Sequence, residues 1–345
     1  MDLNGISASA NSIRALSMDA VQKANSGHPG MPMGNADVAA LLYGELMKHN
    51  PADSKWIDRD RFVLSAGHGS MLLYSVLHLS GYKVSLEDLK NFRQLGSKTP
   101  GHPEYGYTDG VDTTTGPLGA GISNAVGMAA AETILAEKFN TPQHRIVDHY
   151  TYAICGDGCM MEGVSSEASS FAAHQKLGKL ILFYDSNKIT IEGKTDLAFS
   201  EDVAARYEAY GWQVLGCDAF DVEALSKAVA EAKGDKNRPT LIVMKGTIGK
   251  GAATMEGSHH THGAPLGDEE IKATRKKLGI PENEGFYIFP EAKEYFSKVK
   301  EKCAVDYDAW SKEFDAWAAA NPELKKEWDK WMSSELAISD SAMPE

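Results

Sequence analysis

The sequence has 345 residues, 43% of them hydrophobic, and a formal net charge of −13 at neutral pH. This length suits one large α/β domain or two modest ones with a full core, and no segment is apolar enough to span a membrane. The acidic charge disfavours nucleic acid and anionic membranes as partners, and residues 1–10 lack a secretory signal, so we expect a soluble, cytoplasmic protein.

The first part of the chain predicts two helices on either side of an irregular loop. Residues 6–25 and residues 34–47 both carry apolar side chains at helical intervals. Residues 26–30, Ser-Gly-His-Pro-Gly, are too rich in glycine and proline for regular structure. His28 therefore lies in a rigid turn, where a histidine is a better ligand or acid–base candidate than on a helix face.

A second histidine follows a predicted strand. Residues 61–65 predict this strand, and the glycine-flanked turn after it contains His68 and leads into a helix. A glycine-rich turn between a strand and a helix is typical of anion-binding sites. His102 lies in a third loop of this kind, after a short predicted helix at residues 86–93.

Gly116 and Leu118 lie in the glycine-rich segment 113–121, which opens a helix of small residues that continues to residue 136. The glycines permit close approach to a flat or charged ligand. Close packing between helices would explain the same composition.

The central segment predicts two parallel strands joined by a helix. The strands are residues 150–154 and 180–184, and the helix is residues 164–177. A Gly-Asp-Gly turn after the first strand contains Asp157, and Asn187 follows the second strand. Both side chains therefore reach the carboxyl edge of one sheet, where open α/β folds bind ligands.

The side chains at this edge favour a hard cation. Asp157, Asn187 and the backbone carbonyl of Ile189 would form an oxygen-only site of low charge. Such a site suits Mg²⁺ or Ca²⁺ when phosphates supply further ligands. An ordinary glycine-rich turn with an aspartate N-cap is the alternative, but the strands, the helix and the asparagine together favour the cofactor site.

The remaining segments continue the alternation of helices and strands, at residues 203–210, 212–215, 222–233 and 240–244. His259, His260 and His262 lie in the loop 246–267 and suggest Zn²⁺. The loop is irregular and offers no fourth ligand, so zinc is disfavoured. The four cysteines lack disulfide or metal spacing and are interpreted as core or incidental thiols.

The alternation predicts a three-layer α/β/α domain with a mainly parallel sheet. We assign residues 1–267 to this module. Residues 268–332 are rich in lysine, glutamate and tryptophan and predict a helical extension. Residues 333–345 are small, polar and acidic, which is typical of a flexible tail or linker.

Taken together, the motifs resemble the transketolase family over nearly the whole chain. Six motifs occur in family order: residues 26–30, 67–70, 101–104, 116–119, 156–158 and 262–267. The order of several motifs makes the resemblance far more specific than any single one.

The resemblance implies a role for each candidate residue. The metal would be bound by Asp157, Asn187 and the Ile189 carbonyl. The diphosphate of thiamine diphosphate would be faced by His68, Gly158 and His262. The rings of the cofactor would lie beside Gly116 and Leu118. The substrate would be reached by His28, His102 and His262. Glu162 would join a polar network that connects paired active sites.

The resemblance also implies that further modules are needed to complete the enzyme. A transketolase has a second module, which supplies the glutamate that protonates the cofactor's pyrimidine ring, and then a third domain. This sequence ends at Glu345, where the second module is expected. We therefore expect the subunit of a split enzyme, working as a homodimer or heterotetramer with a C-terminal partner on sugar phosphates, or else an excised domain.

Enzymes with the same module are the alternatives. They are dihydroxyacetone synthase, 1-deoxyxylulose-5-phosphate synthase and the α subunit of a 2-oxoacid dehydrogenase. The loops around His102 and His262 favour transketolase or dihydroxyacetone synthase. A non-catalytic cofactor-binding module belongs to a different class, and the intact set of histidines disfavours it.

Overall fold

The centre of the molecule is a five-stranded parallel sheet with the strand order β1-β2-β3-β7-β6. The structure is a computed structural model, and it describes residues 1–333. The strands are β1 (Arg61–Leu64), β2 (Thr151–Gly156), β3 (Leu180–Asp185), β6 (Gln213–Asp218) and β7 (Thr240–Lys245). The central strands are almost entirely buried, as expected for a parallel sheet covered on both faces. The predicted three-layer α/β/α fold is confirmed.

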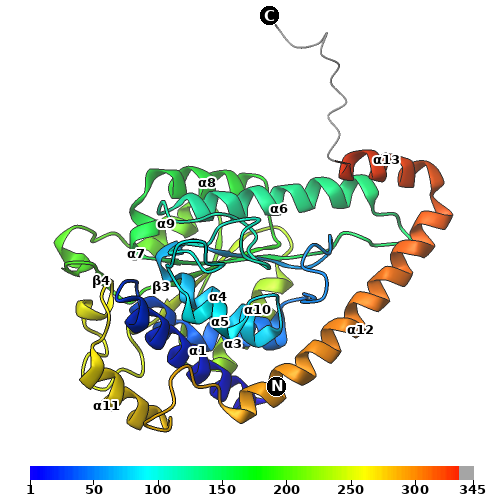
Figure 1. Ribbon diagram of the computed structural model, residues 1–345. Coiled ribbons are helices and arrows are strands. Elements are labelled where there is room, and N and C mark those ends of the chain that lie inside the picture. Colours follow the sequence, from blue (N-terminus) through cyan, green and yellow to red (C-terminus); the bar gives the residue numbers. More distant parts are fainter. Residues whose placement is uncertain (334–345) are drawn as a thin grey trace, which may run out of the picture.

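Helices cover both faces of the sheet (Figure 1). One layer consists of α6 (Ala120–Phe139), α8 (Gly163–His174) and α9 (Val203–Tyr210). The other contains α1 (Leu3–Ala24), α3 (Ala36–Leu41), α4 (Ser70–Ser80) and α10 (Val222–Gly234). Short pieces connect them: α2 (Gly30–Gly34), α5 (Leu86–Lys90), α7 (Asp157–Met161), η2 (Gly67–Gly69), η3 (Thr195–Leu197) and η4 (His259–Thr261).

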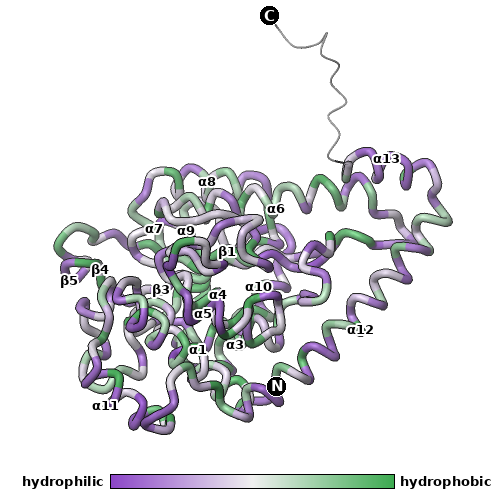
Figure 2. The backbone as a smooth tube through the Cα atoms, in the orientation of Figure 1, coloured by the Kyte–Doolittle hydropathy of each residue, from purple (hydrophilic) through white to green (hydrophobic). Residues whose placement is uncertain are grey.

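The C-terminal part is helical, as predicted, and consists of α11 (Asp268–Leu278), α12 (Pro290–Ala320) and α13 (Pro322–Met332). In Figure 1, α12 runs diagonally along one side of the molecule, and α13 lies near the end of α6. Tyr295 and Phe296 of α12 join the main core, whereas Trp317 and Trp328 pack with Phe139 at the end of α6. Along α12, hydrophilic and hydrophobic residues alternate (Figure 2).

Within residues 1–333, no helix is long and apolar enough to cross a membrane.

Two other segments differ from the sequence-based expectations, and one lies mostly outside the described residues. The tail predicted at residues 333–345 lies outside the described residues, apart from its first residue. The helix predicted at 164–177 ends at His174, because Lys176 adopts a left-handed φ of 55°. A short hairpin, β4 (Ile189–Thr190) with β5 (Gly193–Lys194), was not predicted.

The helix predicted for residues 34–47 is present from Ala36 to Leu46, but it begins as α3 and ends in a π-helical turn, η1 (Leu42–Leu46). Asn35, with φ −110° and ψ 13°, separates it from α2. The Asn35 side chain donates hydrogen bonds to Met31 O and to Asp185. A contact with the end of β3, 150 residues away, thus fixes the break.

Candidate active site

A cavity of about 430 Å³ lies at the carboxyl ends of β2 and β3. It is lined by every candidate site residue except Glu162: His28, His68, His102, Gly116, Leu118, Asp157, Gly158, Asn187, Ile189 and His262. The parallel register pairs Gly156 with Asp185 across β2 and β3, so the loops that follow the two strands begin side by side. Topology therefore gathers residues that are more than 200 positions apart in the sequence.

Four histidines from four separate loops converge on this cavity. The ring centroids of His28 and His68 are 5.0 Å apart, and those of His68 and His262 are 5.1 Å apart. His28 and His262 are separated by 5.8 Å. His102 lies close to Gly116, where an added Cβ would stand 3.4 Å from the His102 ring. These imidazoles form one cluster, as the sequence motifs indicated.

Burial favours the neutral form of all four imidazoles. It lowers the pKa of His28 to about 4 and that of His68 to about 3. It also lowers the pKa values of His102 and His262. A neutral imidazole has one donor and one acceptor nitrogen. Nδ1 of His262 is buried and has no hydrogen-bond partner among the described residues, which is the arrangement expected of an atom that serves a ligand.

Asp157 and Asn187 lie together at the carboxyl edge. Asp157 accepts hydrogen bonds from the Tyr184 hydroxyl at 2.6 Å and from the backbone N–H of Lys188 at 3.2 Å. The amide oxygen of Asn187 accepts from the backbone N–H of Ile189 at 3.0 Å. Burial raises the pKa of Asp157, and the hydrogen bond from Tyr184 and the charge of Lys188 offset this only in part.

A second carboxylate, Asp185, also lines the cavity. The sequence analysis did not single out this residue. Asp185 is buried at the last position of β3, and burial raises its pKa to about 6. Its position between a buried strand and Asn187 was visible in the sequence, but a strand-end aspartate also occurs as a simple cap.

Arg93 is another residue that the sequence analysis missed. It follows the end of α5 with a left-handed φ of 60°. Its guanidinium donates a hydrogen bond to the Ser26 hydroxyl at 2.9 Å and lies 3.4 Å from Nδ1 of His28. The positive charge contributes, after burial, to the low pKa of His28. The sequence analysis assigned Arg93 to the end of the helix predicted at residues 86–93, whereas α5 ends at Lys90, and it lies outside every motif.

The three histidines of the loop 246–267 do not act as one group. His262 faces His68 in the cavity, whereas His259 and His260 contact each other with ring centroids 4.1 Å apart. Within residues 1–333, no group of three or more His, Cys, Asp or Glu side chains is arranged to hold a metal. Glu162 is exposed at the junction of α7 and α8, outside the cavity.

Comparison with known proteins connects this geometry to one family. The family model described as "Transketolase, thiamine diphosphate binding domain" matches residues 6–337. The chain is 58% identical to a transketolase of Treponema pallidum over 93% of its length and 49% of that protein. It is 54% identical to transketolase 1 of Escherichia coli, covering 95% of this chain and 49% of the relative.

Solved structures agree with the sequence relatives. Transketolase from Leishmania mexicana matches 98% of this chain and 51% of its own, with a TM-score of 0.95 at 46% identity. A transketolase of Pichia stipitis in complex with sedoheptulose 7-phosphate matches 99% of this chain and 51% of its own, with a TM-score of 0.94 at 46% identity. The chain therefore spans about half the length of the relatives it matches.

Proposed function

The chain belongs to the family of transketolase thiamine diphosphate-binding domains, and we propose that it acts as the N-terminal part of a transketolase. In this proposal it binds thiamine diphosphate and a divalent metal. Together with a C-terminal module it transfers a two-carbon ketol unit reversibly from a ketose phosphate to an aldose phosphate. The observation that carries the proposal is the convergence of four histidines and an oxygen-donor set on one cavity.

The donor set suits Mg²⁺, with Ca²⁺ as the alternative. Asp157, Asn187 and the Ile189 carbonyl would provide three oxygen ligands, and a diphosphate would provide more. Hard divalent cations prefer such ligands. The two buried carboxylates at this edge, Asp157 and Asp185, have no ion-pair partner within residues 1–333, so a bound dication would compensate their charge.

The cavity also suits the cofactor itself. The unpartnered Nδ1 of His262 and the nearby His68 are available to the diphosphate. Gly158 faces Leu118, and a Cβ at this glycine would stand 2.9 Å from Leu118 Cδ1, so a side chain there would narrow the space. Gly116 has a φ of 153°, which favours glycine beside His102. When bound, thiamine diphosphate supplies a nucleophilic carbon that attacks carbonyl groups.

The histidines would move the protons of the reaction. His28, His102 and His262 would reach the sugar, accept a proton from a hydroxyl and donate to a developing alkoxide. A general acid or base works best with a pKa near the working pH. The low pKa of His28, about 4, would rise when an anionic ligand lies next to it, because an opposite charge favours the protonated ring.

The proposal divides the chain by role. Residues 1–267 would hold the cofactor, and the helical extension 268–332 would support them from one side. Glu162, exposed at the junction of α7 and α8, would join a polar network with a second active site. The pyrimidine-binding module would come from a partner polypeptide, in a homodimer or heterotetramer, in the cytoplasmic pentose phosphate pathway. The sugar phosphate in the related Pichia stipitis complex supports the substrate class.

The test is reconstitution with a partner. The purified chain, assayed with Mg²⁺ and thiamine diphosphate on xylulose 5-phosphate and ribose 5-phosphate, should be essentially inactive. It should still bind the cofactor weakly, because only part of the ligand's contacts are present. Addition of the C-terminal half of a related transketolase should restore ketol transfer. Robust turnover by the chain alone would contradict the need for a partner, and no turnover with any partner would contradict the activity.

A further inference from the structure

Asp185 connects the proposed metal site to the packing of the fold. One of its carboxylate oxygens, Oδ2, accepts two hydrogen bonds from side-chain amides. One comes from Nδ2 of Asn187 at 2.9 Å, and the other comes from Nδ2 of Asn35 at 2.8 Å. The carboxylate is buried, and no lysine or arginine of residues 1–333 pairs with it. Its hydrogen-bond partners are therefore the two asparagines.

These contacts determine which end of the Asn187 amide is available to a cation. An ionised carboxylate only accepts hydrogen bonds, so it fixes the NH₂ group of Asn187 on its own side. The amide oxygen then points the other way, toward the backbone N–H of Ile189 at 3.0 Å. If the amide were rotated by half a turn, it would present its NH₂ group to the cation, and the cation would lose the amide oxygen as a ligand.

Asp185 itself is held from two directions. Asn35, at the break between α2 and α3, also donates to Met31 O at 3.2 Å, so its NH₂ group bridges that carbonyl and the carboxylate. On the other side, the backbone of Gly246 approaches closely, and a Cβ there would stand 2.1 Å from Asp185 Oδ1. The carboxylate has little freedom to follow a displaced Asn187.

We propose that Asp185 is the positioning residue of this metal site, acting through the orientation of the Asn187 amide. Asn35 and Gly246 would keep the carboxylate in place. The inference rests on the proposed function, because it assigns Asn187 as a ligand. Partners that orient a metal ligand in this way typically contribute about 10- to 100-fold in metal affinity.

The experiment compares two substitutions at one position. Asp185→Ala removes both acceptor oxygens. Asp185→Asn removes the charge and puts an NH₂ group in place of Oδ1, but it keeps an oxygen at the position of Oδ2, which accepts from both amides. Calorimetry would measure thiamine diphosphate binding to the full chain at a series of Mg²⁺ concentrations. We expect Asp185→Ala to raise the Mg²⁺ concentration for half-saturation about 10- to 100-fold. Asp185→Asn should change it by much less.

A matched control separates positioning from stability. Asp60 is also buried and also accepts two hydrogen bonds, from the backbone N–H groups of Lys48 and Tyr150, but at the opposite edge of the sheet. Asp60→Ala should lower the melting temperature of the metal-free chain and leave the Mg²⁺ half-saturation unchanged. Asp185→Ala should change the half-saturation even at temperatures where both variants are fully folded.

The outcomes distinguish this inference from the function on which it rests. An unchanged half-saturation in Asp185→Ala, with Mg²⁺-dependent binding intact in the unmodified chain, would overturn the positioning role alone. Equal losses in Asp185→Asn and Asp185→Ala would overturn it too, because charge rather than orientation would then be responsible. If the unmodified chain shows no Mg²⁺-dependent binding, both the function and the inference fail.

Discussion

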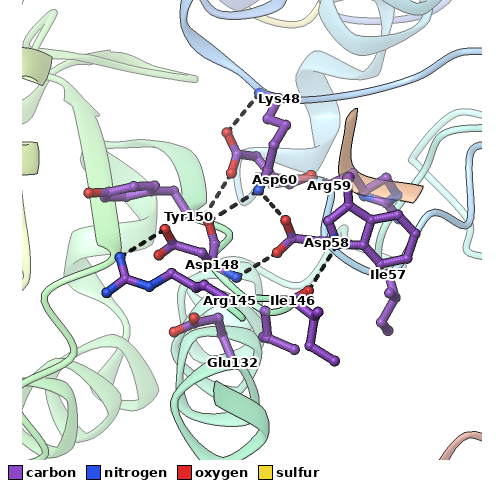
Figure 3. Close-up of polar contacts among 12 residues, drawn as sticks. Lys48, Ile57, Asp58, Arg59, Asp60, Glu132, Arg145, Ile146, Asp148 and Tyr150 are labelled. Atoms are coloured by element: carbon purple, nitrogen blue, oxygen red, sulfur yellow. Dashed lines mark hydrogen bonds and ion pairs between the residues drawn. The ribbon is translucent and has the colours of Figure 1, made fainter. Parts of the chain in front are cut away.

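Carboxylates are buried at the amino ends of the parallel strands, the amino edge of the sheet, and also at their carboxyl ends, the carboxyl edge. The two groups differ in their hydrogen-bond and ion-pair partners. At the amino edge, Asp58 pairs with Lys48 and also accepts from the backbone N–H of Asp148 at 2.5 Å, as Figure 3 shows. Lys179 bridges Glu132 and Asp148 there, at 2.6 Å from each. The protein's own ammonium groups thus partly offset the burial of these acidic side chains, while burial still raises the pKa values of Asp58 and Glu132.

At the carboxyl edge the partners are neutral. Asp157 accepts from a tyrosine hydroxyl and a backbone amide, and Asp185 accepts from two asparagine amides. A buried charge is costly unless it is paired, and hydrogen bonds from neutral groups compensate it only partly. The carboxylates of the amino edge therefore have cationic partners within the chain. At the carboxyl edge, the proposed divalent metal would supply such a partner.

The largest expected effect is at Asp157. Asp157→Ala should abolish metal-dependent binding of thiamine diphosphate, because it removes the one carboxylate proposed to contact the dication directly. Calorimetry with and without Mg²⁺ would measure this. Unchanged cofactor affinity would refute the metal role of Asp157. It would also refute the proposal that the carboxyl edge, unlike the amino edge, binds a cation.

A smaller effect is expected for the histidines that would contact the sugar. His28→Ala and His102→Ala should lower the rate of ketol transfer about a hundredfold in the reconstituted enzyme, or about 2.7 kcal/mol, and leave cofactor affinity unchanged. His144→Ala is the control, since His144 contacts Glu313 at 3.0 Å on the loop before β2. Parallel losses of rate and cofactor affinity would mean that the two histidines bind the diphosphate instead.

The amino edge should respond in stability rather than in binding. Asp58→Asn removes the charge that pairs with Lys48, whose side chain is 29% exposed, compared with 4% for Asp58. We expect a loss of about 2 kcal/mol in the free energy of unfolding, measured by urea denaturation, and unchanged cofactor affinity. A loss of cofactor affinity without a loss of stability would show that the two edges are not functionally distinct.

The low pKa values of the buried histidines should make the stability of the chain depend on pH. Burial holds the pKa of His28 at about 4 and that of His68 at about 3, both below the ordinary value of 6.5. The unfolded chain binds these protons at a higher pH than the folded chain, so stability should fall as the pH is lowered from 6.5 toward 4. Urea denaturation at several pH values would check this.

The cofactor should change these pKa values at one edge only. Its diphosphate should raise the pKa values of His28 and His68 by about one unit, or about 1.4 kcal/mol each. His149, at the amino edge, has a pKa lowered by burial and then by Arg61 and Lys48, and it should not change. NMR titration would follow all three rings. An equal pKa shift at His149 would mean that cofactor binding changes histidine pKa values throughout the fold and not only at the carboxyl edge.

Much of the fold could be predicted because its causes are local. Apolar runs such as residues 180–184 define buried strands, and the alternation of strands with helices implies a parallel sheet. The order of the glycine and histidine motifs then identified the cavity residues, because parallel strands bring the loops after them to one edge. His68 and His262 reach the cavity in this way, since they follow β1 and β7, whereas His28 and His102 follow the helices α1 and α5.

What remained depends on contacts between distant segments. Neither the break at Asn35 nor the left-handed conformation of Arg93 follows from neighbouring residues. A strand-end aspartate such as Asp185 has the same local sequence whether a lysine or two asparagines lie opposite it. Only the tertiary structure decides which partners a buried charge meets. The sequence by itself determined which chemical groups reach the carboxyl edge. Packing decided that Asp185 would face two asparagine amides rather than a lysine or arginine side chain.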